Sequence, residues 1–338
     1  MMVSRIIAIA IVVSLLFTWS SAQDDLNAEL QQLQDQRAQL KAEMEAANTA
    51  GDRAKYDQLL AQWEEIAKKI QELQEQLSQN TEQRANAVKA YNEGNKLLQQ
   101  GKTDQAIEKY KESLKYDSQN PKVYYNLGVA QYKAKDFPGA LASFENAIKV
   151  SSAYAEAYFM KGSVLDKMDR LSDALKAYRD AITYEPTYAK AYYGMGSIYQ
   201  SHKKNEDAAA AFRQAVELDP KYELAYLSLA QVSIDLGKHD QAIEAANSAL
   251  GIKSSWKANY LKAMAANKNG NPQLAIEAAK ACLTQKSNYA GAYFEIGLAY
   301  ENMDNRAKAK EYFSKCLDDR QWRPNAEYRI KLLEGGQQ

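Results

Sequence analysis

A period of 34 residues runs through most of this chain and restricts its fold more than any other feature. One position recurs at this step and is glycine in five of its seven occurrences. The occurrences are Gly94, Gly128, Gly162, Gly196, Ala230, Met264 and Gly297. Every step is 34 residues except the last, which is 33. A fixed period of this length indicates one supersecondary unit stacked many times, because a single unit cannot bury its own apolar face.

Three further series of residues share this period. The second series is Ala106, Ala140, Ala174, Ala208, Ala242, Ala275 and Ala309. The third is Ala90, Tyr124, Tyr158, Tyr192, Tyr226, Tyr260 and Tyr293. The fourth is Tyr110, Phe144, Tyr178, Phe212, Ala246, Ala279 and Phe313. We expect the glycine to lie where two helices meet most closely, and the aromatic residues to fill the space between successive helix pairs.

With these four series, residues 87 to about 320 resemble the tetratricopeptide repeat family, whose unit is a 34-residue helix–turn–helix. The resemblance implies an all-α fold, a right-handed α-solenoid of about seven such repeats over residues 81–319. The repeats are expected near 87–120, 121–154, 155–188, 189–222, 223–256, 257–289 and 290–319. Residues 320–338 are expected to form a capping helix and tail at the end of the stack. Repeats five and six depart from the pattern, because they lack both the glycine and the aromatic residue.

Residues 23–80 carry a different pattern, two heptad tracks without a proline. The tracks mirror each other, so that Leu26 at the start of the first matches Leu77 at the end of the second. Gly51 suits the left-handed position that ends one helix, and Asp52 suits the cap that starts the next. We therefore predict an antiparallel coiled-coil hairpin that reverses at these two residues. One long helix that oligomerises is the alternative.

One residue interrupts the apolar seam of this hairpin. Arg37 stands opposite Ile66 in the mirrored tracks. We expect its aliphatic stem to cover Ile66 while its guanidinium reaches water. Because two helices alone bury little apolar surface, homo-oligomerisation through residues 23–80 stays open.

Residues 1–22 have the layout of a secretory signal peptide. Arg5 supplies a positive charge, an apolar run of 12 residues follows from Ile6 to Phe17, and Ala22 ends the segment. This run is shorter than the ~20 residues that span a bilayer. We therefore expect an exported protein of the bacterial periplasm. Secretion, or anchoring by an uncleaved N-terminal segment, is the alternative.

The sequence offers no pattern for catalysis, cofactor binding or metal binding. Both histidines, His202 and His239, fall in predicted turns, and neither a phosphate-binding glycine loop nor a metal-ligand spacing is present. Cys282 and Cys316 occupy equivalent positions of neighbouring repeats, too far apart for a disulfide, so we expect both to be buried and unpaired. With 43 basic and 43 acidic residues, no net field attracts nucleic acid. We predict a binding protein rather than an enzyme.

The family resemblance implies a concave groove lined by the first helix, helix A, of each repeat. The residue after the third series would point into this groove. The predicted partner-binding residues are Tyr91, Asn95, Tyr125, Asn126, Phe159 and Tyr193. We expect them to hold an extended peptide or a partner helix. Packing of the rings against neighbouring repeats is the alternative.

Some members of the family grip a C-terminal carboxylate with asparagines and cations. Asn95 and Asn126 match the asparagine positions, but Tyr91, Glu156 and Met160 stand where the cations should be. Without cations a charge-assisted grip is absent, so this activity is not expected.

The layout as a whole is similar to bacterial periplasmic proteins that join a coiled coil to such repeats, among them the TolA-binding coordinators of envelope constriction. The similarity is one of layout, so their partners are not transferred. We predict a non-catalytic protein–protein interaction scaffold of the cell envelope, with protein or peptide partners and a place in an envelope or membrane-protein complex. The alternative is a structural oligomeric spacer or assembly factor that acts through the N-terminal coiled coil.

Overall fold

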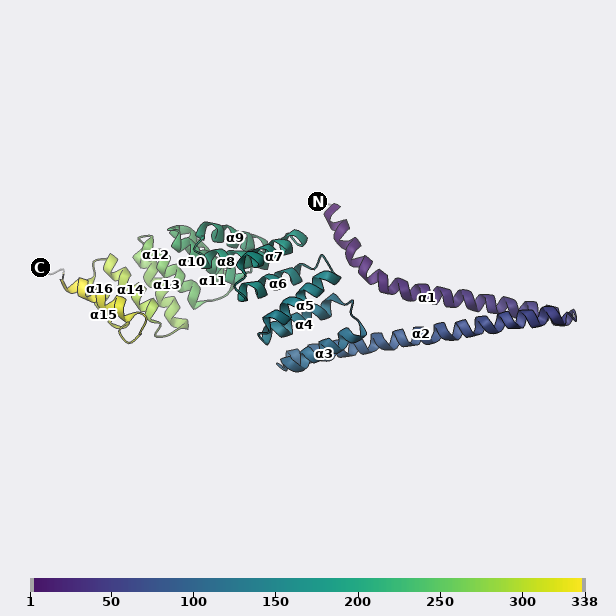
Figure 1. The fold of residues 1–338 in the computed structure, drawn as a ribbon. Coiled ribbons are helices and arrows are strands. Elements are labelled where there is room, and N and C mark those ends of the chain that lie inside the picture. Colours follow the sequence, from purple (N-terminus) through teal and green to yellow (C-terminus); the bar gives the residue numbers. More distant parts are fainter. Residues whose placement is uncertain (1–2, 336–338) are drawn as a thin grey trace. The chain divides into compact units, whose positions relative to one another are not determined.

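The computed structural model describes the backbone of residues 3–335 and the side chains of residues 23–335 (Figure 1). All regular structure in the described residues is helical, which confirms the all-α prediction. The chain divides into two compact units, Met1–Val123 and Tyr124–Gln338. The predicted signal peptide, residues 1–22, lies outside the side chains described. Among the helices that the structure describes, none is both long enough and apolar enough to cross a membrane.

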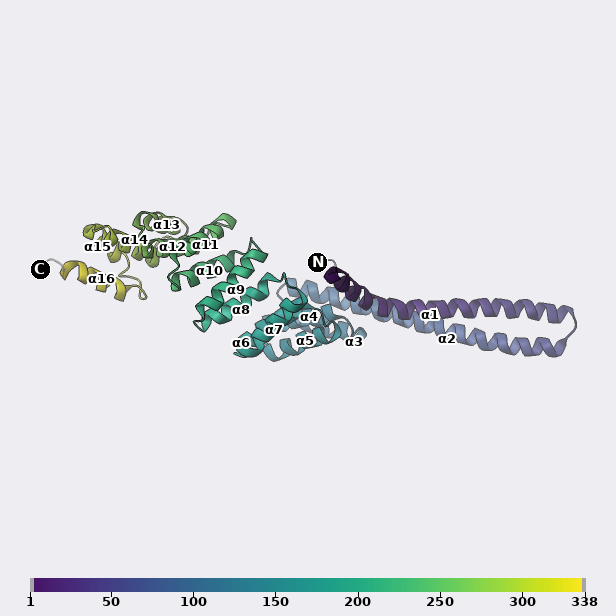
Figure 2. The ribbon, with the colours of Figure 1, turned by 90° about the horizontal axis from the view of Figure 1, so that it is seen from above.

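Two long helices form an antiparallel hairpin in the first unit (Figure 2). Helix α1 spans Val3–Thr49 and α2 spans Arg53–Gln99. Gly51 in the turn has a φ of 75°, a conformation that a residue without a Cβ adopts at little cost. The Asp52 carboxylate caps α2 by accepting a hydrogen bond from the Lys55 N–H at 3.1 Å. The predicted turn is confirmed.

The two arms of the hairpin share a single apolar seam. Met44, Ala47 and Leu59 form a buried cluster near the turn, and Ile70 and Leu73 are buried farther along α2. The remaining positions of the heptad tracks are half-buried, and most outward-facing residues of both arms are exposed. The arms therefore spend their apolar residues on each other.

Arg37 lies differently from the prediction. Its guanidinium carbon is 4.0 Å from the centroid of the Trp63 ring, so the charged group stacks on the ring inside the seam instead of extending into water. A guanidinium over a tryptophan face is attracted by the ring quadrupole, which explains why a cation is tolerated at this position.

Helix α2 does not end where the hairpin seam ends. It continues unbroken through the expected boundary between residues 80 and 81, and its last turns form helix A of the first repeat. Helix α3, Thr103–Tyr116, packs back against it as helix B. The Ser113 hydroxyl donates to the Ala87 carbonyl at 2.8 Å and ties the two helices together. One helix therefore belongs to both the hairpin and the first repeat.

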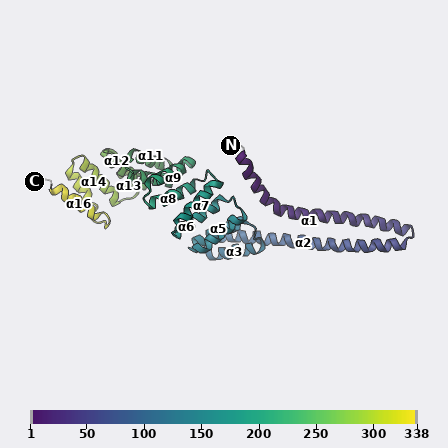
Figure 3. The ribbon, with the colours of Figure 1, turned by 45° about the horizontal axis from the view of Figure 1, so that its top comes forward.

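The second unit consists of helix pairs that follow one another along the chain (Figures 1 and 3). Its A helices are α4 (Pro121–Lys133, which begins in the first unit), α6 (Ala155–Lys167), α8 (Ala189–Ser201), α10 (Glu223–Asp235), α12 (Trp256–Lys268) and α14 (Ala290–Asn302). Its B helices are α5 (Phe137–Val150), α7 (Leu171–Tyr184), α9 (Asn205–Leu218), α11 (His239–Ile252), α13 (Pro272–Gln285) and α15 (Arg306–Ser314). Each B helix up to α13 contacts the A helix that follows it, and neighbouring A helices from α6 to α14 also touch.

A last helix, α16 (Arg323–Gly335), packs on α15 at the C-terminal end of this stack. Ala326 is buried there, and Trp322, Ile330 and Leu333 pack against the Phe313 cluster. This arrangement agrees with the capping role that a solenoid requires of its terminal element.

All seven turns between helix A and helix B place one residue in the left-handed region. These residues are Gly101, Lys135, Asp169, Lys203, Gly237, Gly270 and Asp304. Their spacing repeats the sequence period, so the repeats share one turn geometry even where the residue is not glycine.

Candidate partner-binding face

In five repeats the ring of helix B lies on the glycine of helix A in the same repeat. A Cβ built on Gly162 would meet the Tyr178 ring at 2.6 Å, and one on Gly196 would meet the Phe212 ring at 2.6 Å. The same contact occurs between Gly94 and Tyr110, Gly128 and Phe144, and Gly297 and Phe313. These rings therefore pack inside their own helix pair, which corrects the expectation that they only fill the space between pairs.

Some of these rings also reach the next repeat. A Cβ on Gly194, in the helix A that follows, would come within 2.6 Å of the same Tyr178 ring. Tyr178 is thus enclosed between two glycines of consecutive A helices, and this contact matches the original expectation.

Repeats five and six are built without this contact. Ala230 faces Ala246 in the first of them, and Met264 and Ala279 hold the same positions in the second. The three alanines are fully buried, and Met264 is partly buried. Because a small side chain replaces the ring on helix B, helix A needs no glycine.

The predicted binding residue Tyr125 belongs to a cluster of three rings. Its ring centroid lies 5.7 Å from that of Phe144 on its own helix B and 5.2 Å from that of Tyr154, just before the next helix A. The same cluster recurs as Phe159 with Tyr178 and Tyr188, Tyr193 with Phe212 and Tyr222, and Phe294 with Phe313 and Trp322. Ring pairs at such distances contribute about 0.5–1.5 kcal/mol each beyond their burial.

Tyr125, Phe159 and Tyr193 occupy equivalent positions of α4, α6 and α8, and each is half-buried. Each ring is held by two others, as the packing alternative expects, and keeps an exposed part, as a binding role requires. Asn126 is half-buried on α4 beside Tyr125. We name the exposed parts of these four residues the ring face.

The two predicted residues of the first unit, Tyr91 and Asn95, both lie on α2. The Tyr91 ring is 6.1 Å from that of Tyr110, and the Asn95 Oδ1 accepts a hydrogen bond from the Tyr110 hydroxyl at 2.8 Å. This bond gives Asn95 a structural role in its own repeat, which the sequence pattern did not reveal.

The tyrosines that precede the A helices were missed at the sequence level. Tyr154, Tyr188, Tyr222 and Tyr289 are each the residue directly before an A helix. They form a fifth series with the 34-residue period, broken at Ser255. The signal was therefore present, but the positions fall between predicted helices and were treated as connections.

Electrostatically, the ring face combines neutral hydroxyls with acidic groups. Burial raises the pKa of Tyr178 to about 12 and that of Tyr188 further still. At Tyr125 burial raises the pKa, and the Glu156 charge adds to the effect. Burial and then the like charge of Glu156 also raise the pKa of Glu185. These tyrosines remain protonated at neutral pH, so they can bind a partner through ring surface and neutral hydrogen bonds.

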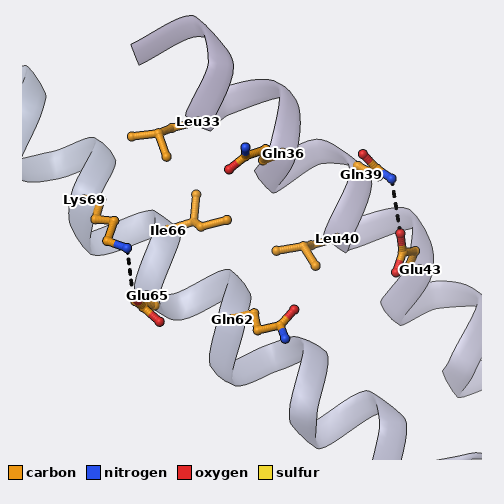
Figure 4. A pocket seen from close by; sticks show the side chains of 9 residues that line it. All are labelled: Leu33, Gln36, Gln39, Leu40, Glu43, Gln62, Glu65, Ile66 and Lys69. Carbon is orange, nitrogen blue, oxygen red and sulfur yellow. Dashed lines mark hydrogen bonds and ion pairs between the residues drawn. The ribbon is translucent and has the colours of Figure 1, made fainter. Parts of the chain in front are cut away.

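An open cleft of about 420 Å³ lies on the flank of the hairpin (Figure 4). Leu33, Leu40 and Ile66 form its floor, and the Lys69–Glu65 ion pair at 2.8 Å stands at its edge. Both partners of that ion pair lie on α2, and the apolar floor is the seam itself. The cleft is therefore the side of the seam, with no polar group directed into it from a buried position.

Both cysteines are buried and unpaired, as predicted. Burial raises the pKa of the Cys282 thiol to about 11 and that of Cys316 to about 12, so both stay protonated and unreactive at neutral pH. Across the described residues, no three His, Cys, Asp or Glu side chains gather in a way that could hold a metal ion.

Three family models match the chain. One described as TPR repeat matches residues 94–135, and one described as tetratricopeptide repeat matches residues 134–191, 159–223, 193–255 and 227–290. A second tetratricopeptide repeat model matches residues 290–318. Together the matches run from residue 94 to residue 318, well over half of the chain. No curated protein matches it.

Several solved structures share the fold. The C-terminal part of a TPR repeat-containing protein from Cytophaga hutchinsonii has a TM-score of 0.58 and 15% identity, over 71% of this chain and 99% of that one. PilF of Pseudomonas aeruginosa has a TM-score of 0.54 and 18% identity, over 66% and 98%. YrrB, described as a TPR protein with an unusual peptide-binding site, has a TM-score of 0.50 and 24% identity, over 55% and 97%.

Proposed function

The chain belongs to the tetratricopeptide repeat proteins, and from this premise we propose that it is a non-catalytic scaffold of the cell envelope that binds a peptide or partner helix on its ring face. Such repeats generally bind protein or peptide partners. The single observation that carries the proposal is the row of half-exposed rings at Tyr125, Phe159 and Tyr193, each fixed by two neighbouring rings.

Fixed rings are suited to binding because their conformational entropy is already lost in the folded state. A partner that covers them gains apolar contact without ordering the side chains again. The hydroxyls of Tyr125 and Tyr193 add hydrogen-bonding capacity at the edge of the same surface. An extended peptide or an amphipathic helix could use both kinds of contact.

The envelope location rests on the signal-peptide pattern of residues 1–22, and it is part of the proposal. The hairpin supports a spacing role beside the binding role. Its apolar residues form one seam that the two arms already share, and most of its outward-facing residues are exposed and polar. This distribution favours a spacer over an arm that oligomerises.

The test replaces Tyr125, Phe159 and Tyr193 together by leucine. Leucine is chosen because the chain itself carries it at the equivalent positions of repeats five and six. We expect partner capture from an envelope fraction, quantified by mass spectrometry, to fall at least tenfold against the wild-type chain. Circular dichroism should show the same helix content in both.

The matched control is Tyr328→Leu, which removes a ring that is 62% exposed on α16, away from the ring face. Its capture should equal that of the wild type. Undiminished capture by the triple variant would remove the ring face from the proposal.

A further inference from the structure

A buried carboxyl group joins the sixth and seventh repeats. Glu295 lies on α14 and is only 5% exposed. Its Oε2 accepts a hydrogen bond from the Asn267 Nδ2 of α12 at 2.7 Å, and the same Nδ2 donates to the Glu295 backbone carbonyl at 2.9 Å. The contact therefore connects the A helices of two neighbouring repeats.

The other atom of the Asn267 amide lacks a partner. Its Oδ1 is buried and accepts no hydrogen bond from any described residue. An ionised carboxylate can only accept, whereas a protonated carboxyl group carries an O–H that can donate. A neutral Glu295 would supply the donor that Oδ1 lacks, and the acid and the amide would then satisfy each other. An ionised Glu295 leaves an acceptor unsatisfied beside a buried charge, which is costly.

The groups that face Glu295 do little to stabilise its charge. Helix α12 presents Tyr260 and Lys268, Tyr289 precedes α14, and α13 presents Cys282 behind the two tyrosines. The tyrosines and the thiol are neutral at physiological pH because burial raises the pKa of each. The positive charge of Lys268 lowers the pKa of Glu295, but burial outweighs it and holds that pKa at about 7.

This carboxyl group is specific to one end of the second unit. The residues at the equivalent position of the earlier A helices are Asn126, Met160, Gly194, Ser228 and Lys262. None of these is acidic, so a response to pH through this position is confined to the contact between α12 and α14.

We propose that Glu295 and Asn267 form a pH-sensitive contact, which holds the sixth and seventh repeats together while the carboxyl group is neutral and loosens α14 from α12 when it ionises. The inference is independent of the ring face and of any partner. Because the folded state holds the proton more tightly than the unfolded state, this stabilisation is complete below about pH 4.5. It is lost as the pH rises through about 7.

The experiment is hydrogen exchange of the α14 amides in the full-length chain at pH 5 and pH 8, corrected for intrinsic rates. We expect the protection of α14 in the wild type to fall on the order of a hundredfold between the two pH values. Glu295→Gln keeps the shape and stays neutral, so its protection should change less than threefold. The control Glu277→Gln, exposed on α13, should behave as the wild type.

An equal loss of protection in wild type and Glu295→Gln, or no loss in the wild type, would overturn the inference. A second measurement needs no variant. The ¹³C shift of the Glu295 side-chain carboxyl in the wild-type chain should titrate with a midpoint near 7. A midpoint near the ordinary 4.5 would contradict the neutral, paired state.

Discussion

Repeats two to four and seven differ from repeats five and six in how they fill the same helix pair. The first group places a ring of helix B on a glycine of helix A, as Phe212 lies on Gly196. The second group brings small side chains together, as Ala230 and Ala246. Both solutions keep the period and the helix pair, so what a repeat requires is the combined volume of the two positions. Neither residue type is required alone.

The two groups also differ in how well their buried polar atoms are satisfied. At one shared position of helix A, repeat two has Gln131, whose Oε1 accepts a hydrogen bond from Ser143, and repeats three and four have Leu165 and Tyr199. Repeats five and six have Ser233 and Asn267, whose Oγ and Oδ1 are buried without partners among the described residues. Unsatisfied polar atoms lower local stability, so the alanine repeats should open first.

The largest effect expected from this difference follows removal of a ring. Phe212→Ala should lower the free energy of unfolding by about 3–5 kcal/mol, because the fully buried ring leaves a cavity over Gly196. Chemical denaturation followed by circular dichroism measures the loss. Tyr328→Ala, on an exposed ring, is the control and should stay within about 0.5 kcal/mol of the wild type. A loss below about 1 kcal/mol for Phe212→Ala would mean that the pair collapses to fill the space.

An intermediate effect is expected at the glycine, and it tests the volume rule directly. Gly196→Ala alone should cost about 1–3 kcal/mol, because its Cβ would press on the Phe212 ring. The double variant with Phe212→Ala reproduces the pair found in repeat five, so it should cost less than the sum of the two single changes. We expect a coupling of about 0.5–3 kcal/mol in the double-mutant cycle. Strict additivity would show that the two positions are independent.

The smallest effect is expected in the turns, where the repeats share one backbone. Lys203 in repeat four has a φ of 56°, and Gly237 in repeat five has a φ of 73°. A side chain in this region costs about 1 kcal/mol, so Lys203→Gly should stabilise the chain by up to that amount and Gly237→Ala should destabilise it similarly. Thermal unfolding of the two variants side by side measures both signs. Equal signs would show that the turns differ in geometry after all.

Much of this fold could be predicted from the sequence because its signals are local and repeated. A glycine and a ring at a fixed spacing indicate a helix pair, and the mirrored leucine tracks place the hairpin turn at Gly51 and Asp52. The continuity of α2 past residue 80 had weaker signals. No glycine or proline ends the helix there, but a polar stretch also suits a linker.

The site could be predicted only in part, because it depends on contacts between repeats. The rings of Tyr125 and Phe159 follow from the period, but the tyrosines that complete their clusters lie between helices and have no helical pattern. Glu295 is a charged residue on a helix face, and such residues are usually solvated. Only the packing of α12 against α14 shows that it is buried.

The unbroken course of α2 has a mechanical consequence. A helix of 47 residues is about 70 Å long, since each residue adds 1.5 Å. No joint separates its hairpin part from the part that pairs with α3, so a pull or twist applied at the Gly51 turn travels along a rigid rod into the first repeat. The tip of the hairpin and the start of the repeats therefore act as the two ends of one lever.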